Sequence, residues 1–239
     1  MKIRLNRFLS LCGLSSRRKA ELIIQDGQIY VNGKVETKLQ KIIDTENDEV
    51  FHQKNRLIPQ DFEYYKMNKP RFYLTTMSEN ENRRTVRDLL FGFKTKLFPI
   101  GRLDYDTEGL LLFTNDGKIA HRISHPSFLV DKTYLAYLNK KISPTLLDKM
   151  RKGANLKDGF LLPGKLVLIK GDLNETLLKI QIHEGRNHII KNFFKFFGCN
   201  VTKLKRISVG PIKLGELESG KIVKLDYNEL EALLKLVTK

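Results

Sequence analysis

The first part of the chain carries two apolar stripes with helical spacing. Residues three and four positions apart make up these stripes: Leu5, Phe8, Leu9 and Cys12 in the first, and Ala20, Ile23 and Ile24 in the second. Gly13 ends the first helix, and Ser15 or Ser16 caps the second. Asp26-Gly27 ends the second helix. The pattern therefore predicts two short helices within the first 27 residues.

A hairpin is expected directly after these helices. The short apolar runs of residues 29–31 and 34–35 flank Asn32-Gly33. This dipeptide favours a tight turn, because both of its residues tolerate positive φ. Residues 44–60 are polar and mixed in charge, and the span Gln53–Asp61 is interpreted as a linker. We therefore expect two domains, residues 1–60 and 61–239.

Strand-like and helix-like segments follow one another in the second domain. Strands are expected within residues 63–70, 96–100, 109–116, 129–138, 176–185 and 200–214. Helices are expected over residues 85–90, 117–123, 143–153, 186–198 and 226–236. No β-α-β unit repeats. The expected fold class is therefore α+β: a small α/β domain, then a domain with a mixed, mainly antiparallel sheet flanked by helices.

The charge balance points to a polyanionic partner. The chain has 43 Lys and Arg against 27 Asp and Glu, a formal net charge of +16. Residues 1–41 hold nine basic and three acidic side chains, and residues 183–213 hold seven and one. Nucleic acid is the commonest partner of such a surface. The alternative is a lysine-rich proteome, which raises the isoelectric point without any function.

Arg17 and Arg18 strengthen the case for an anion site. Both fall in the first turn of the second helix, where the helix dipole disfavours cations and where free N–H groups attract phosphate. A solvated basic face is the structural alternative.

The cysteines and the absence of targeting signals in the sequence favour a cytoplasmic protein. The two cysteines, Cys12 and Cys199, form no disulfide or zinc pattern. The N-terminus lacks the apolar stretch of a signal peptide, and no apolar run approaches the ~18 residues of a membrane helix. We expect a monomer without membrane attachment.

The stretch GRLDYDTEGLLLFTND, residues 101–116, concentrates acidic side chains. Asp104, Asp106 and Glu108 alternate like the start of a calcium loop, but no later glutamate completes it. No nucleophile elbow, Walker loop or dinucleotide fingerprint is present. The remaining hypothesis is a single working carboxylate on a loop at a sheet edge, which needs a cation beside it.

Two resemblances extend this interpretation. The segment RLNRFLSLCGLSSRRKAELIIQDGQIYVNGK resembles the S-four RNA-binding domain, a module that docks structured RNA and does no chemistry. The segments GRLDYDTEGLLLFTNDG, DKTYLAYL and EGRNHIIKNFFKFFGCNVTKLKRISVGPIKLGEL, with NKP before them, resemble the bacterial ribosomal-RNA pseudouridine synthases of the RsuA/RluB type. That family detaches one uracil base from its sugar, turns it and rejoins it through ring carbon five, with no cofactor and no metal.

The second resemblance implies roles for particular residues. Asp104 would be the catalytic aspartate, attacking either the sugar or the base ring. Tyr134 would stack on the flipped base, and Lys191 would pair with Asp104. Asp106 and Thr107 would shape the loop. Together with the first domain, which would dock RNA, the expected RNA-binding residues are Arg102, Arg4, Arg7, Arg17, Arg18, Lys19, Arg186 and Asn187.

One departure from the family concerns the segment EGRNHIIKN. Ile189 stands where the family has glutamine, and Asn192 replaces the second basic residue. Polar contacts from this segment are therefore in doubt, although Lys191 keeps the charge. Four nearby phenylalanines, at positions 193, 194, 196 and 197, are expected mostly in the core.

The expected function is isomerisation of a specific uridine, with ribosomal RNA or a ribosome-assembly intermediate as partner. Large-subunit rRNA is preferred, because the loop motif and His125-Pro126 are more similar to the RluB branch. The alternatives are a small-subunit enzyme and a catalytically silent rRNA-binding assembly factor.

Overall fold

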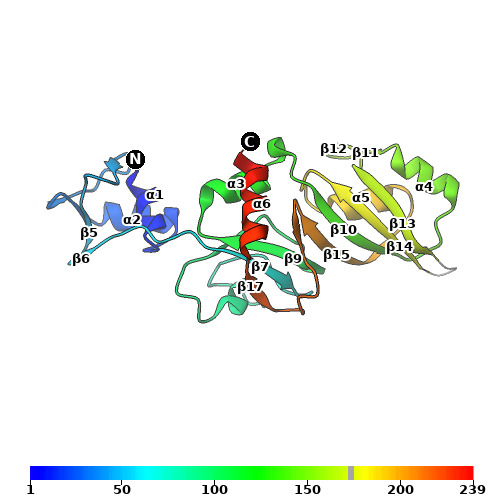
Figure 1. Ribbon diagram of the computed structural model, residues 1–239, viewed down its shortest axis with the longest axis horizontal. Coiled ribbons are helices and arrows are strands. Elements are labelled where there is room, and N and C mark those ends of the chain that lie inside the picture. Colours follow the sequence, from blue (N-terminus) through cyan, green and yellow to red (C-terminus); the bar gives the residue numbers. More distant parts are fainter. Residues whose placement is uncertain (172–174, 239) are drawn as a thin grey trace. The chain divides into compact units, whose positions relative to one another are not determined.

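The structure, a computed structural model, describes residues 1–171 and 175–238 and divides into two compact units (Figure 1). The first unit comprises Met1–Glu63 with Lys94–Lys96, and the second comprises Tyr64–Phe93 and Leu97–Lys239.

The first unit holds two helices and two small sheets. Its elements are β1 (Lys2–Arg4), α1 (Leu5–Leu11), α2 (Arg17–Gln25), β2 (Ile29–Val31), β3 (Lys34–Val35), β4 (Ile42–Asp44), β5 (Val50–His52) and β6 (Asn55–Arg56). One sheet pairs β1 with β4, and the other has the order β3-β2-β5-β6. Ser16 caps α2 by accepting a hydrogen bond from the Lys19 N–H. Asn32 and Gly33 turn the expected hairpin at φ 50° and 76°.

The expected linker over Gln53–Asp61 is partly wrong. Its first residues form the turn and second strand of the β5–β6 hairpin, with Gln53 at φ 55°. The hairpin is anchored by the buried Val50, whose carbonyl accepts from the Leu57 N–H. The sequence pattern did not predict this hairpin, because β6 is polar and because Gln-Lys occupies the turn instead of a glycine dipeptide.

The second unit is built on a nine-stranded sheet. Its strands are β7 (Tyr64–Lys69), β8 (Phe98–Ile100), β9 (Thr107–Thr114), β10 (Lys132–Leu138), β13 (Lys165–Gly171), β14 (Thr176–Ile182), β15 (Val201–Val209), β16 (Ile212–Lys213) and β17 (Ile222–Lys224). Their order is β13-β14-β10-β15-β9-β7-β17, with β16 beside β15 and β8 beside β9. Within this sheet β15 and β9 run parallel and the other pairs antiparallel. The expected α+β class with a mixed, mainly antiparallel sheet is confirmed.

Helices cover both faces of this sheet. They are η1 (Val86–Leu90), α3 (Gly117–Ser124), η2 (Pro126–Phe128), α4 (Pro144–Arg151), α5 (Ile189–Phe196) and α6 (Tyr227–Thr238), with a β11–β12 hairpin (Ala154–Leu156, Gly159–Leu161) between α4 and β13. Leu111 and Phe113 of β9 pack in one core with α4 and α5, whereas Leu110 and Leu112 pack in a second core with α3 and α6. Strand β9 is thus buried on both faces, which explains its unbroken apolar run.

The phenylalanines of α5 largely follow the expectation. Phe193 and Phe194 are fully buried and Phe197 packs against the core, whereas Phe196 is exposed. The hairpin β11–β12 and strand β13 had no counterpart in the sequence interpretation.

The parallel contact between β9 and β15 depends on Gly109. Its backbone lies at φ 106°, and a Cβ atom there would stand 2.2 Å from the Arg206 carbonyl oxygen. Only glycine allows the two strands to approach this closely.

Gly109→Ala should therefore lower the free energy of unfolding by roughly 3 kcal/mol, through overpacking and backbone strain. The control is Gly117→Ala at the start of α3, where a Cβ atom meets nothing within 4 Å. It should change stability by no more than about 0.5 kcal/mol. Urea unfolding measures both. Equal stability of the two variants would contradict the close approach.

Candidate active site

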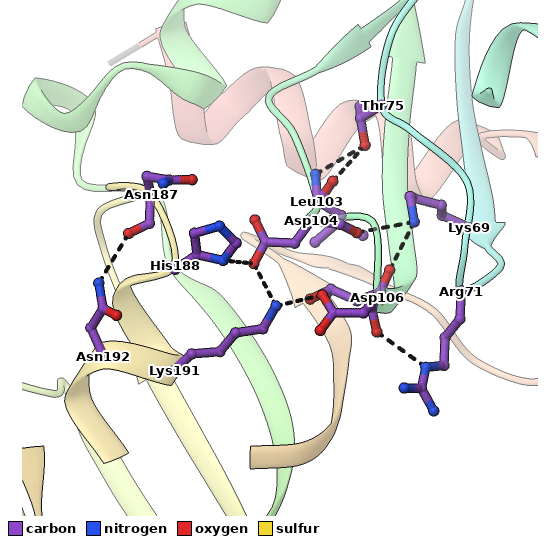
Figure 2. Close-up of polar contacts among 11 residues, drawn as sticks. Lys69, Arg71, Thr75, Leu103, Asp104, Asp106, Asn187, His188, Lys191 and Asn192 are labelled. Atoms are coloured by element: carbon purple, nitrogen blue, oxygen red, sulfur yellow. Dashed lines mark hydrogen bonds and ion pairs between the residues drawn. The ribbon is translucent and has the colours of Figure 1, made fainter. Parts of the chain in front are cut away.

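The loop between β8 and β9 carries Asp104 and is fastened to the stretch of chain from the last residue of β7, Lys69, to Thr75 (Figure 2). Five consecutive backbone carbonyls, those of residues 103–107, each accept a hydrogen bond from that segment. The donors, in order, are Thr75 Oγ1 (2.8 Å), Lys69 Nζ (3.2 Å), the Phe72 N–H (2.6 Å), Arg71 Nε (3.2 Å) and again Lys69 Nζ (2.8 Å). The backbone beneath the Asp104 side chain is therefore held at every residue.

Lys69 is the centre of this arrangement. Its side chain is fully buried, and its ammonium donates a third hydrogen bond to the Pro70 carbonyl at 2.9 Å. Burial lowers the pKa of Lys69 to about 8, although the nearby carboxylates of the loop act in the opposite direction. Three carbonyl acceptors compensate the ammonium for its lost water.

The Asp104 carboxylate faces two nitrogen groups. Its Oδ2 atom lies 3.0 Å from Lys191 Nζ and 3.0 Å from His188 Nδ1 (Figure 2). The pairing of Asp104 with Lys191 is the one expected from the sequence. Lys191 also contacts Asp106 Oδ1 at 2.5 Å, so one ammonium serves both carboxylates. Burial acts to raise the pKa of Asp106, but the hydrogen bond and charge of Lys191 outweigh it and the pKa is lowered.

A pocket of about 340 Å³ opens beside this carboxylate. That volume lies at the lower end of the roughly 300–1,000 Å³ typical of small-ligand sites. Six of the expected site residues line it: Arg102, Asp104, Tyr134, Arg186, Asn187 and Lys191. The other expected RNA-binding residues, Arg4, Arg7, Arg17, Arg18 and Lys19, lie in the first unit, where all five are exposed.

Tyr134 reaches the pocket from β10 and is largely buried. The Arg206 guanidinium lies 6.0 Å from its ring centre, and Arg206 Nε donates to the Leu110 carbonyl at 2.7 Å. Lys132 is buried on the same strand, and burial, with help from the charge of Arg206, lowers its pKa to about 8. Two buried cations, Lys132 and Arg206, thus lie on the strands beside Tyr134, outside the pocket lining.

The segment before α5 differs from its expected form. A helix was expected from Arg186, but α5 begins at Ile189 because His188 adopts a left-handed backbone at φ 52°. Arg186 is bound internally, to Glu184 at 2.5 Å and to the carbonyls of Asp158 (2.5 Å) and Phe160 (3.0 Å). This turn aims the His188 ring at the Asp104 carboxylate.

Sequence reasoning assigned no role to His188, Lys69 or Arg71. His188 lies three positions before Lys191, a spacing that puts two side chains on one face of a helix, although His188 itself stands just before α5. Lys69 belongs to the NKP segment that was noted, but a pattern of residue types does not reveal that a lysine is buried.

Neither a metal-binding cluster nor a membrane-spanning helix occurs in the part of the chain that the structure describes. No three His, Cys, Asp or Glu side chains gather there as a metal site would require. No described helix combines the length and apolar character needed to cross a membrane.

Known proteins match this chain over nearly its whole length. Residues 63–196 match the RNA pseudouridylate synthase family. The chain belongs to that family. Residues 3–50 match the S4 domain, which is the S-four module expected from the sequence. The protein is thus a pseudouridine synthase with an N-terminal RNA-binding domain, and the sequence-based identification is confirmed.

Individual relatives agree with this assignment. An RNA pseudouridine synthase of Aquifex aeolicus is 43% identical over 99% of this chain and 96% of its own length. The ribosomal large subunit pseudouridine synthase B of Bacillus subtilis is 35% identical, over 98% and 96% of the two chains. A crystal structure of a pseudouridylate synthase superposes with a TM-score of 0.67 at 28% identity, covering 97% of this chain and 99% of that one.

The buried Lys69 predicts a pH-dependent contribution to stability. The unfolded lysine keeps its proton up to about pH 10.5, whereas the folded one loses it near pH 8. Between these values the unfolded state binds more protons, so stability from this residue rises with pH. The stability of the wild type relative to Lys69→Met should therefore rise by roughly 3 kcal/mol from pH 8 to 10.5.

Chemical unfolding of both proteins across this range measures the effect. Taking the difference cancels the titration of Cys12 and Tyr64, whose pKa values burial raises. Lys203→Met, which removes a half-exposed lysine of β15, is the matched control. A pH-independent difference for Lys69→Met would contradict a buried, protonated ammonium at this position.

Proposed function

We propose that this pseudouridine synthase isomerises one uridine of large-subunit ribosomal RNA. The observation that carries the proposal is the Asp104–Lys191 ion pair beside Tyr134, in a pocket at the end of a rigidly held loop. The Bacillus subtilis relative, a ribosomal large subunit pseudouridine synthase, supports the choice of the large subunit. Small-subunit rRNA is the second candidate. The enzyme would work in the cytoplasm, on rRNA or on a ribosome-assembly intermediate.

Asp104 is the proposed nucleophile. It attacks the nucleoside at the sugar or at the base ring, and the released uracil turns before it is rejoined through carbon five. Lys191 and His188, each 3.0 Å from the Asp104 Oδ2 atom, hold the carboxylate in one orientation. The hydrogen bonds to the loop carbonyls support this role, because a nucleophile that is already positioned needs little reorganisation.

The target base must leave its stack before Asp104 can reach it, at a cost of a few kcal/mol. Tyr134 is proposed to hold the flipped base by stacking, since its ring borders the pocket. Arg102, exposed at the pocket rim, is proposed to displace the base from the RNA. Asn187 is a proposed RNA contact at the same rim.

The first unit is proposed to dock the RNA backbone. Arg17, Arg18 and Lys19 are exposed in the first turn of α2, where the free N–H groups of a helix end also attract phosphate. Arg4 and Arg7 add exposed positive charge at the adjoining helix α1. Arg186, which we expected to contact RNA, is proposed instead to act through the turn that it braces, because its donors already have internal acceptors.

Pseudouridine mapping of both ribosomal RNAs from cells lacking the gene tests this proposal. One large-subunit site should lose its modification and regain it with the wild-type gene. Asp104→Asn should leave the site unmodified, because the amide cannot act as the nucleophile. Glu108→Gln is the control. Glu108 forms an ion pair with Lys203 (3.1 Å), and neither residue lines the pocket, so this variant should restore the modification.

A lost site in small-subunit rRNA would overturn the choice of subunit. Restoration by Asp104→Asn would overturn the proposed nucleophile.

A further inference from the structure

Four side chains outside the proposed chemistry gather along the Asp104 loop. We call them the Phe72 platform: Arg71, Phe72, Arg83 and Tyr105. The rings of Phe72 and Tyr105 meet edge to face, with centroids 5.6 Å apart. The Arg71 guanidinium lies 5.0 Å from the Phe72 ring centre, and that of Arg83 lies 5.3 Å from the Tyr105 ring centre. Phe72 is 52% exposed and Tyr105 37%, so these rings are not part of the core.

The backbone of Phe72 makes this exposure unusual. It lies in the left-handed region at φ 65°, where a bulky residue is an outlier. The loop gains from this conformation through the Phe72 N–H, which donates to the Tyr105 carbonyl at 2.6 Å. That bond uses backbone atoms alone, and glycine would make it with less strain. The phenyl ring is thus an extra feature that the fold does not require.

The position of the platform relates it to the reacting nucleotide. Tyr105 is the residue next to Asp104, and Arg71 also binds the Asp106 carbonyl. Figure 2 shows the Arg71 guanidinium directed away from the side of the loop where Asp104 meets His188 and Lys191. The pocket lining likewise includes none of the four residues. The platform therefore lies outside the pocket on the loop that carries Asp104, and it is available to a nucleotide adjacent to the uridine rather than to the uridine itself.

We propose that the Phe72 platform stacks the base of an unpaired nucleotide adjacent to the target uridine. Extruding one base removes a stacking partner from its neighbour, and an exposed aromatic ring replaces that partner without regard to sequence. Arg71 and Arg83 attract the flanking phosphates and hold the rings by cation–π contact. The inference rests on the enzyme's action on RNA and not on which ribosomal RNA is the target.

A purely conformational role for Phe72 and a stacking role predict opposite rankings of the activity of Phe72 variants. If the residue only shapes the loop, Phe72→Gly and Phe72→Asn suit a left-handed backbone and should work as well as the wild type. If the ring stacks on a base, both should lose kcat/KM on rRNA by roughly 5- to 150-fold, mainly through KM. Phe72→Trp should then retain activity. The melting temperature of Phe72→Gly should not fall, which separates lost stacking from lost folding.

Tryptophan fluorescence tests the contact without turnover. The chain contains no tryptophan, so Phe72→Trp places a single reporter on the platform. The probes are a short single-stranded RNA and an abasic strand of equal length and charge. Stacking predicts quenching by the base-bearing strand and little by the abasic one. Phe196→Trp is the control, because Phe196 is similarly exposed (57%) on α5, and it should be quenched much less.

Equal quenching by the two strands, or at the two positions, would overturn the proposal. Full activity of Phe72→Gly would overturn it as well. If the enzyme modified neither ribosomal RNA, the proposed target would fail, but the fluorescence comparison would still decide the platform.

Discussion

The site depends on one constraint, the fixing of five consecutive carbonyls from Leu103 to Thr107 by the end of β7 and the segment that follows it. A loop ordinarily leaves its backbone to water and moves. Here Lys69 gives up hydration to hold two of those carbonyls from inside the protein, and burial lowers its pKa to about 8. Burying an ammonium costs free energy, and the hydrogen bonds that this ammonium makes fix the position of the Asp104 carboxylate.

The rest of the second unit brings the partners of that carboxylate to it. Strand β9, buried on both faces, anchors the loop to the sheet, and Gly109 lets β15 lie against it. Helix α5 begins one residue after the left-handed His188, so that Lys191 and His188 both face Asp104. Since these groups come from distant parts of the chain, the site exists only in the assembled sheet.

The sequence predicted most of this framework but little of its fine geometry. Apolar periodicity and caps located most helices and strands. The resemblance of three separate segments to the pseudouridine synthases pointed to Asp104, Tyr134 and Lys191, and all three line one pocket. The β5–β6 hairpin was missed because its turn lacks glycine. The burial of Lys69 was missed because it depends on packing between segments far apart, which residue types alone do not specify.

Amide hydrogen exchange of the free protein, followed residue by residue by NMR, tests the central claim most directly. The N–H groups of Phe72, Leu103 and Thr107 bind Tyr105, Thr75 and Asp104 within the loop assembly. If the loop is held before RNA arrives, these amides should exchange as slowly as those of β9, because they open only with the sheet. Exchange at the rate of an exposed loop would contradict the account, because the carboxylate would then be positioned only by the bound RNA.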